Sequence, residues 1–514
     1  MKYFLTLIQL WVGFLSICAS YPKANIWIIP SVESPQVYRN YAQTSKVHLE
    51  MARGEVEHIQ LVFPSKVNEE YRFTFDRYLK GIQISARELK KMNGYYDALV
   101  PFKNQLKCTD TLTAVWITVQ CPSRVPVGKY HQTIKIEGSK HFTIQLDYNV
   151  HHTTIPLKSS IPITVGVENR CMTECLNDKE ADKERQRWVD FVLSYRMTPV
   201  FGTQITPERW QYEHSLSPWA WNDKRSIRLL NDRRYSCYML PFFTLSENEL
   251  ASLLCNIQKK GKLKESLFYI WDEPAYMEDY EQIKRKVNII RKYASDARIL
   301  TTFFCGPRNG PRKGDLYAVF DYLKHHIHVA TISLAPCKGN EEEVQHIRYK
   351  VPEGIDWWSY VCWQPGGNEP NFLLQMKGIQ QRAIMWRTWK NGSQGFLYWN
   401  CNIYHKRNPF TYITDMPHGD GILIYPGDIL GCKGPIASAR LERWRDGAEE
   451  MELLRLVEKN YSKEKADTLL NIVYSSPLSF IEKAHNIPFF RKELLDQLDK
   501  TIPIDYKLRI TDFI

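Results

Sequence analysis

The chain has 514 residues, which is enough for two or three domains with a sizeable core. Hydrophobic residues make up 44% and charged residues 24%, which is ordinary for a globular protein. The formal net charge is +11, but the basic residues are spread along the chain and form no single arm, so nucleic-acid binding is not indicated. Attraction to an acidic glycan or to a membrane surface stays open. Aromatic residues reach 13%, which fits either large cores or rings that stack on the flat apolar faces of sugars.

The first 20 residues, MKYFLTLIQLWVGFLSICAS, predict a secretory signal peptide. Lys2 precedes an apolar stretch that is too short for a good membrane span, and small residues follow it. We therefore expect cleavage near Ser20 and an exported protein: periplasmic, secreted or on the cell surface. A lipid anchor at Cys18 is a less favoured alternative, because Ile17 occupies a position where lipoprotein signals have a small residue.

Metal and cofactor motifs are missing from the sequence. It contains no Cys-x-x-Cys pair and no His-Glu-x-x-His motif, and its histidine clusters lack metal-site spacing. No Gly-x-Gly-x-x-Gly follows a predicted strand, so a dinucleotide has no support. We expect neither a metal nor an organic cofactor. The 12 cysteines include Cys18, so an odd number remains after cleavage, and export permits disulfides.

Residues 21–157 predict an N-terminal antiparallel β-sandwich. Short β-rich runs alternate with turn residues, and the clearest are at 26–29, 58–63, 114–119 and 133–136. Pro156 and Pro162 bracket a short connector, and we place the domain boundary there.

Residues 158–435 change to an alternation of strands and helices. Ser246 and Glu249 form a capping box before one of the helices. Eight strands are expected, at 163–167, 199–202, 237–240, 268–271, 299–304, 329–334, 357–361 and 395–399. This number predicts a (β/α)8 TIM-like barrel, with a doubly wound open sheet as the competing fold. Residues 436–514 predict a closing helical region that packs on the barrel.

The stretch FYIWDEPAY at 268–276 places two acids, Asp272 and Glu273, at the end of the fourth strand. Barrel enzymes carry their chemistry at this end of the strands. Because Pro274 cannot donate a ladder hydrogen bond, regular pairing should stop there and let both acids turn into one pocket. Desolvation and mutual repulsion would then raise the pKa of one of them, as a general acid requires. The alternative is a helix start, where acids suit the helix dipole.

Adjacency of the acids limits the mechanism. Consecutive Cα atoms lie about 3.8 Å apart. Two such carboxyls are poorly placed to act from opposite faces of a sugar as nucleophile and acid, which usually lie about 5 Å or more apart. They suit substrate assistance better, in which a 2-acetamido group is the nucleophile, one acid orients it, and the other protonates the leaving oxygen.

Several motifs together resemble glycoside hydrolase family 123. They are Trp271-Asp272-Glu273-Pro274, the sandwich segments at 52–62 and 126–130, the strand segments at 357–362 and 395–399, Pro370-Asn371-Phe372, and the C-terminal segments at 419–427, 440–442 and 445–447. The resemblance implies a retaining β-N-acetylgalactosaminidase without metal or cofactor. It implies that Glu273 is the general acid and base, that Asp272 positions the acetamido group during oxazolinium formation, and that the substrate is a glycan or glycolipid.

The resemblance also implies five further substrate-binding residues: Trp358, Tyr360, Tyr398 and Trp399, which lie near strand ends, and Asn371 in the loop after the seventh strand. Strand alternation allows only about half of the aromatic ones to face inward, and Asn371 could instead cap a helix. Asp420 is interpreted as a turn residue between two glycines, and the charged residues at 440–446 as a structural ion-pair network. Hydrolysis of another sugar and non-catalytic glycan binding stay open as alternative functions. The oligomeric state is not indicated by the sequence.

Overall fold

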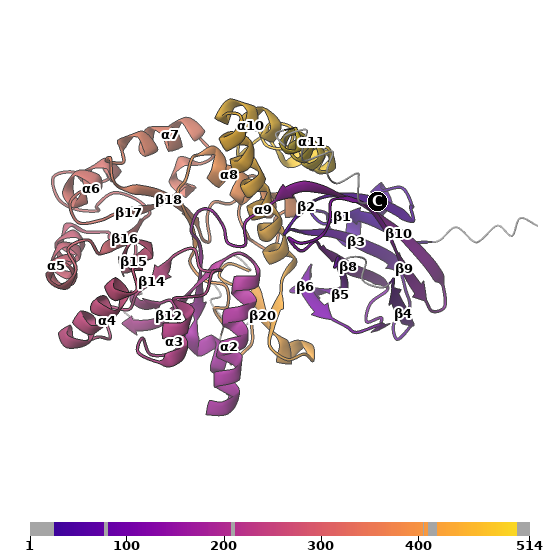
Figure 1. Cartoon of the computed structure of the whole chain (residues 1–514), viewed down its shortest axis with the longest axis horizontal. Helices are drawn as coiled ribbons and strands as arrows, with labels where there is room; N and C mark the ends of the chain where they lie inside the picture. Colours follow the sequence, from indigo (N-terminus) through magenta and orange to yellow (C-terminus); the bar gives the residue numbers. More distant parts are fainter. Residues whose placement is uncertain (1–24, 77–80, 207–210, 405, 410–418, 501–514) are drawn as a thin grey trace, which may run out of the picture.

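The computed structural model describes residues 25–76, 81–206, 211–404, 406–409 and 419–500. Figure 1 shows two regions, a β-rich N-terminal part and a larger part in which helices surround a second sheet, with helix α9 (Ala439–Asn460) running between them. The predicted signal peptide and Cys18 lie outside the described residues. In the described ranges, no helix is long and apolar enough to cross a membrane, and all 11 cysteines there carry free thiols.

The N-terminal region consists of two packed five-stranded sheets, ordered β1-β3-β8-β5-β6 and β2-β10-β9-β4-β7. Side chains of both sheets, such as Ile117 and Ile134, share one apolar core, because alternate residues of each strand face the other sheet. Their strands are β1 (Trp27–Pro30), β2 (Lys46–Arg53), β3 (Val56–Pro64), β4 (Glu70–Phe75), β5 (Gln83–Met92), β6 (Tyr95–Pro101), β7 (Gln105–Lys107), β8 (Leu112–Gln120), β9 (Gly128–Glu137) and β10 (His141–Thr154).

The prediction of a purely antiparallel sandwich is met only in part. All pairs of the first sheet are antiparallel, but β2 and β10 of the second sheet run parallel. These two strands are far apart in the chain, and the strands between them provide the long crossover that parallel pairing needs.

The second region is built on a nine-stranded, nearly closed sheet ordered β13-β12-β11-β19-β18-β17-β16-β15-β14. The Leu216 N–H donates to the Met239 carbonyl across the remaining gap, at 2.7 Å. Its strands are β11 (Ile163–Glu168), β12 (Thr198–Thr206), β13 (Gln211–Ser215), β14 (Tyr238–Met239), β15 (Ser266–Trp271), β16 (Arg298–Phe303), β17 (Val329–Ser333), β18 (Asp356–Val361) and β19 (Phe396–Tyr398).

All eight predicted strands of this region form and pair in parallel. The ninth strand, β13, was not predicted; it is antiparallel to β12 and lies between β12 and β14. The sheet is therefore barrel-like, but a regular (β/α)8 barrel is not confirmed.

Helices connect the parallel strands and cover the outside of this sheet (Figure 1). The predicted capping box begins α4: the Ser246 hydroxyl accepts the Glu249 N–H at 3.4 Å, and the Glu249 carboxylate accepts the Ser246 N–H at 2.9 Å. The helices are α1 (Asn169–Thr173), α2 (Asp178–Ser194), α3 (Lys224–Leu229), α4 (Glu247–Lys259), α5 (Met277–Tyr293), α6 (Leu316–Leu323), α7 (Glu341–Lys350) and α8 (Gly378–Lys390).

The chain closes with a short hairpin, β20 (Ile424–Pro426) and β21 (Pro435–Ala437), and then α9, α10 (Lys463–Leu470) and α11 (Ile487–Asp499). Helix α9 is buried almost all around, including most of its charged side chains. Arg440, Glu442, Arg445 and Asp446 form buried ion pairs, which confirms the predicted structural network.

Candidate active site

Strand β15 ends in a backbone break that turns both acids to one side. Its pairing with β16 shifts register between Tyr269 and Trp271, and Glu273 then adopts a left-handed backbone with φ of 42°. Helix α5 begins only at Met277, so Asp272 and Glu273 do not form the first turn of a helix. The alternative of a helix start is therefore wrong, and both carboxylates line the same cavity, as the break at Pro274 predicts.

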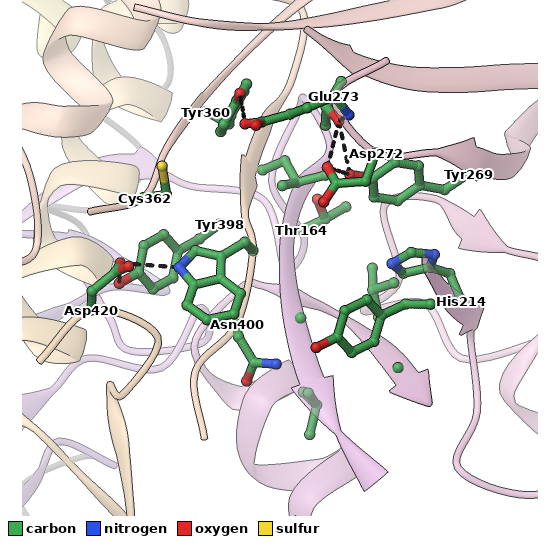
Figure 2. A pocket seen from close by; sticks show the side chains of 18 of the residues that line it. Thr164, His214, Tyr269, Asp272, Glu273, Tyr360, Cys362, Tyr398, Asn400 and Asp420 are labelled. Atoms are coloured by element: carbon green, nitrogen blue, oxygen red, sulfur yellow. Dashed lines mark hydrogen bonds between the residues drawn. The ribbon is translucent and has the colours of Figure 1, made fainter. Parts of the chain in front are cut away.

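This cavity has a volume of about 390 Å³, and the carboxyl ends of β15, β18 and β19 open into it. Figure 2 shows how its labelled side chains converge. It is lined by Thr164, Gly166, Val167, Val200, Gly202, Tyr212, His214, Tyr269, Asp272, Glu273, Thr302, Tyr360, Cys362, Trp363, Leu397, Tyr398, Trp399, Asn400 and Asp420.

Asp272 is held through one of its two oxygens. The hydroxyls of Tyr269 and Thr302 both donate to Asp272 Oδ1, each at 2.7 Å. Among the described residues nothing donates to Asp272 Oδ2, which leaves it free to accept from a bound molecule. Burial raises the pKa of Asp272 above its usual value, and the two hydroxyl bonds offset this rise only in part.

Glu273 is held by its backbone and by one phenol. Its N–H donates to Thr302 Oγ1 at 3.0 Å, and the Tyr360 hydroxyl donates to Glu273 Oε1 (Figure 2). Burial, and next the negative charge of Asp272, raise the pKa of Glu273 to about 7; Tyr360 and Arg308 act in the opposite direction. Both carboxylates still meet water through the open cavity, and a bound sugar that displaces this water would strengthen the effect of burial.

The two acids thus share one proton, so that one is protonated while the other is charged. Hydroxyl donors favour the charged form of Asp272, and that charge favours the neutral form of Glu273. Near neutral pH, the pair holds a carboxylate next to a carboxylic acid, which is the arrangement that general acid catalysis needs.

Three of the five predicted substrate-binding residues line the cavity. Tyr360 contacts Glu273, and Tyr398 and Trp399 form part of the cavity wall. Both of the latter reach the cavity because β19 ends at Tyr398, so strand alternation no longer separates them. Their hydroxyl and indole N–H donate to Asp420 Oδ1 at 3.1 and 3.0 Å.

The other two predicted residues do not line the cavity. Trp358 shares the inner face of β18 with Tyr360 but lies one pleat deeper, where it packs in the apolar interior of the sheet. Asn371 is fully buried, and its Nδ2 donates to the carbonyls of Cys362 and Pro365 at 2.9 and 2.8 Å. Its amide therefore fixes a loop and is not available to a sugar.

Sequence reasoning missed several cavity residues. Thr302 is the next-to-last residue of β16 and Asn400 follows β19, so the rule that barrel chemistry lies at strand ends could have found them. His214 lies on the unpredicted strand β13, where its ring stacks on Tyr269 at a centroid distance of 4.2 Å. Burial lowers the pKa of His214 to about 4, so its imidazole is neutral.

Asp420 is a cavity residue and not only a turn residue. It is almost fully buried, and Oδ2 has no hydrogen-bond partner in the described structure. Burial raises the pKa of Asp420 to about 6, while the bonds from Trp399 and Tyr398 lower it.

Comparison with known proteins identifies the chain. The family model "Glycoside hydrolase 123, catalytic domain" matches residues 183–457, which include both acids and most of the cavity. No curated protein matches the sequence.

Two solved structures illustrate how far the similarity extends. A family 123 glycoside hydrolase from Clostridium perfringens has a similar fold, with a TM-score of 0.65 at 13% identity over 92% of this chain and 98% of its own. A β-D-glucuronidase from Dictyoglomus thermophilum covers 79% of this chain and 71% of its own at 9% identity, but its TM-score of 0.32 is too low to support an argument. The chain belongs to glycoside hydrolase family 123 and is a glycoside hydrolase.

Proposed function

We propose that the protein is an exported, retaining exo-glycosidase that removes terminal β-linked N-acetylgalactosamine by a substrate-assisted mechanism. The observation that carries this proposal is the pair Asp272 and Glu273, two adjacent acids in one cavity with different partners. Because the two carboxyls are rooted side by side, neither is well placed to attack the sugar from the face opposite to the other.

In the first step, Glu273 protonates the glycosidic oxygen while the acetamido carbonyl oxygen of the substrate attacks the anomeric carbon. The C–O bond to the leaving group breaks, and an oxazolinium ion forms. Asp272 Oδ2 accepts the acetamido N–H, and its negative charge stabilises the positive charge that develops on the ring. Tyr269 and Thr302 keep Asp272 oriented and charged.

In the second step, Glu273 is a carboxylate and takes a proton from a water molecule. That water attacks the anomeric carbon and opens the oxazolinium ring. Two inversions at this carbon give net retention of configuration. Glu273 returns to its protonated form, which its pKa of about 7 supports near neutral pH.

The charge of the cavity favours a neutral sugar. It is lined by three acidic side chains, Asp272, Glu273 and Asp420, and no lysine or arginine is among its described lining residues. Arg308 acts on Glu273 from outside the lining, but a uronic acid or a sulfated sugar would still bring a further negative charge next to these acids, at an electrostatic cost. A neutral 2-acetamido sugar carries an N–H donor and hydroxyls that these acids can accept.

The size of the cavity favours removal of one terminal residue. At about 390 Å³ it lies at the lower end of the roughly 300–1,000 Å³ typical of small-molecule sites. The similar hydrolase from Clostridium perfringens is described in connection with glycolipid glycan hydrolysis, which supports a glycan or glycolipid substrate here as well. Export and any association with a membrane surface rest on the N-terminal sequence and the positive net charge alone.

The test is hydrolysis of aryl β-N-acetylgalactosaminide, compared with the glucosaminide and the plain galactoside, with Glu273→Gln as the control variant. Turnover of the galactosaminide that is lost in the variant supports the sugar, the acetamido role and the acid together. Equal turnover of the plain galactoside contradicts substrate assistance, because that sugar has no acetamido group. Turnover of none of the three contradicts the proposed sugar and favours another glycan or a binding role.

A further inference from the structure

Trp363 is an exposed indole at the edge of the cavity. Its residue exposure is 42%, although it lines the same cavity as Tyr269, Tyr360 and Tyr398, which are at most 8% exposed. A large apolar ring left in solvent beside an active-site cavity is a surface that a ligand can cover.

The backbone around Trp363 is fixed. Asn371, fully buried, donates from Nδ2 to the carbonyls of Cys362 and Pro365, which lie on either side of Trp363. The Cys362 N–H also donates to the Gln364 carbonyl at 3.0 Å. The loop therefore presents the indole in a defined position, so little backbone freedom is lost when a ligand covers it.

The position of Trp363 along the chain places it just beyond the end of β18 that carries Tyr360. It follows β18 by two residues, and Tyr360 of the same strand donates to Glu273. A general acid lies on the side of the cavity where the leaving group departs, since it protonates the oxygen that links the two parts of the substrate. Trp363 is thus on the side where the rest of the glycan leaves the cavity.

We propose that Trp363 forms a binding subsite for the sugar that carries the terminal residue, with its indole stacked on the apolar face of that second pyranose ring. This rests on the proposed function, because it assumes that a terminal sugar occupies the cavity. A lipid is a poorer fit, since the exposed neighbours Gly366, Gly367 and Asn368 offer no apolar surface that would extend the indole.

Binding is measured with the full chain that carries Glu273→Gln, because this variant should leave the substrate intact. The measurement separates the proposed terminal-sugar site from the proposed Trp363 subsite. Titration calorimetry with methyl β-N-acetylgalactosaminide reports the terminal site alone. The β1,3- and β1,4-linked disaccharides of N-acetylgalactosamine with galactose report both sites. We expect at least one disaccharide to bind about 10-fold more tightly than the methyl glycoside, which corresponds to about 1.4 kcal/mol.

Adding Trp363→Ala should abolish this 10-fold gain and leave binding of the methyl glycoside within about 2-fold. Trp363→Phe should keep part of the gain, because a smaller ring still stacks. Tyr349→Ala is the matched control: Tyr349 is 87% exposed on α7 and is not among the residues that line the cavity, so its removal should change nothing.

Other results would overturn the subsite. An undiminished gain in Trp363→Ala would show that the indole does not contact the second sugar. An equal loss for the methyl glycoside would make Trp363 a wall of the terminal site. A loss seen only with a glycolipid in micelles would mean that the indole contacts lipid. Failure of every ligand to bind the Glu273→Gln chain would refute the proposed terminal sugar, and the subsite with it.

Discussion

Acidic side chains gather in two regions of this molecule, and the groups around them differ. In the cavity, the carboxylates of Asp272 and Glu273 accept hydrogen bonds only from hydroxyls of the described residues. At the contact of α9 with the N-terminal sheets, Glu442 and Asp446 are bonded to cationic side chains. Glu442 and Asp446 are buried, whereas Asp272 and Glu273 reach the solvent of the open cavity, so both exposure and partners decide what each acid can do.

The pKa values follow these partners. Burial raises the pKa of Glu442, but Arg445, Arg87 and His58 outweigh it, and the pKa falls well below the usual range. Asp446 is likewise lowered against the effect of burial, chiefly by His58 and Arg382. In the cavity Tyr360 and Arg308 offset burial and the charge of Asp272 only in part, and the pKa of Glu273 rises to about 7. The α9 acids are permanently charged and structural, whereas Glu273 exchanges a proton near neutral pH.

The same comparison explains why the N-terminal sheets are firmly attached to the second region. His58 on β3 bonds Asp446 at 2.8 Å, and Arg491 on α11 bonds Glu57 at 2.9 Å. Ion pairs that are buried this deeply add little net stability relative to apolar packing, but breaking one leaves a buried charge without a partner. The contact therefore tolerates few arrangements other than the observed one.

Loss of the exchangeable proton should have the largest effect. Glu273→Gln keeps the shape of the side chain but cannot donate a proton, and we expect kcat to fall by about 10²–10⁴-fold. The midpoint of urea unfolding should stay the same or rise, because no cation loses its partner. Rates with the glycan or aryl substrate, measured beside urea unfolding, check both parts. A variant that keeps full activity would exclude Glu273 as the acid.

Removal of a cation from the other region should affect stability and not chemistry. Arg382 bonds Glu450 at 2.6 Å and Asp446 at 3.0 Å, so Arg382→Met removes one cationic partner from each of two buried carboxylates, which keep only Arg491 at 3.5 Å and His58 at 2.8 Å among the described ion pairs. We expect a loss of about 3–5 kcal/mol in the free energy of unfolding, measured with urea at pH 7. The activity of the folded fraction should be unchanged.

Lys292 supplies the control for this prediction. It pairs with Glu247 at 2.8 Å, but both side chains are more than half exposed. Lys292→Met should therefore cost less than about 1 kcal/mol. Equal losses of unfolding free energy in the two variants would show that the buried ion pairs contribute no more to stability than an exposed one.

Thr302 offers a way to disturb the acid pair without removing an acid. Its hydroxyl accepts the Glu273 N–H and donates to Asp272, so it fixes both acids at once. Thr302→Val is nearly equal in size but lacks the hydroxyl, and we expect kcat to fall by about 10–100-fold with little change in KM. Thr302→Ser should restore most of the rate. A rate unchanged in the valine variant would mean that Tyr269 alone positions Asp272.

The sequence allowed the prediction of elements that depend on local patterns. The eight parallel strands, the capping box at Ser246 and the strand break before Pro274 all follow from short-range periodicity or from the chemistry of single residues. Strand β13 escaped prediction because Gln211–Ser215, with the sequence QYEHS, has no clear apolar alternation, and only its pairing with β12 defines it.

For the site, strand-end position predicted the two acids, Tyr360, Tyr398 and Trp399. Trp358, also near a strand end, and Asn371, which the family resemblance suggested, do not line the cavity, because depth below the cavity and the partners of a buried amide are set by tertiary packing. The hydroxyls that donate to Asp272 belong to Tyr269 on the same strand and to Thr302 on the next strand. Only the register of β15 with β16 brings them together.

The smallest expected effect concerns the pH dependence of the acid. Tyr360 donates to the ionised form of Glu273 and so lowers its pKa; without this bond the pKa must rise above its value of about 7. Glu273 has to be protonated for the first step, so activity is lost as the pH rises through this pKa. Tyr360→Phe should therefore move the basic limb of the kcat/KM profile to higher pH, by less than about 1 unit.

The acidic limb provides the internal control for this shift. It reports protonation of the carboxylate that the pair retains, which Tyr269 and Thr302 favour on Asp272. These two bonds are intact in Tyr360→Phe, so the acidic limb should move much less than the basic one, and the profile should widen. A basic limb that moves to lower pH would mean that Tyr360 stabilises the protonated form of Glu273 and accepts its proton. In that case the protonated carboxyl of Glu273 would donate to the Tyr360 hydroxyl, so the hydrogen bond between them would run in the opposite direction.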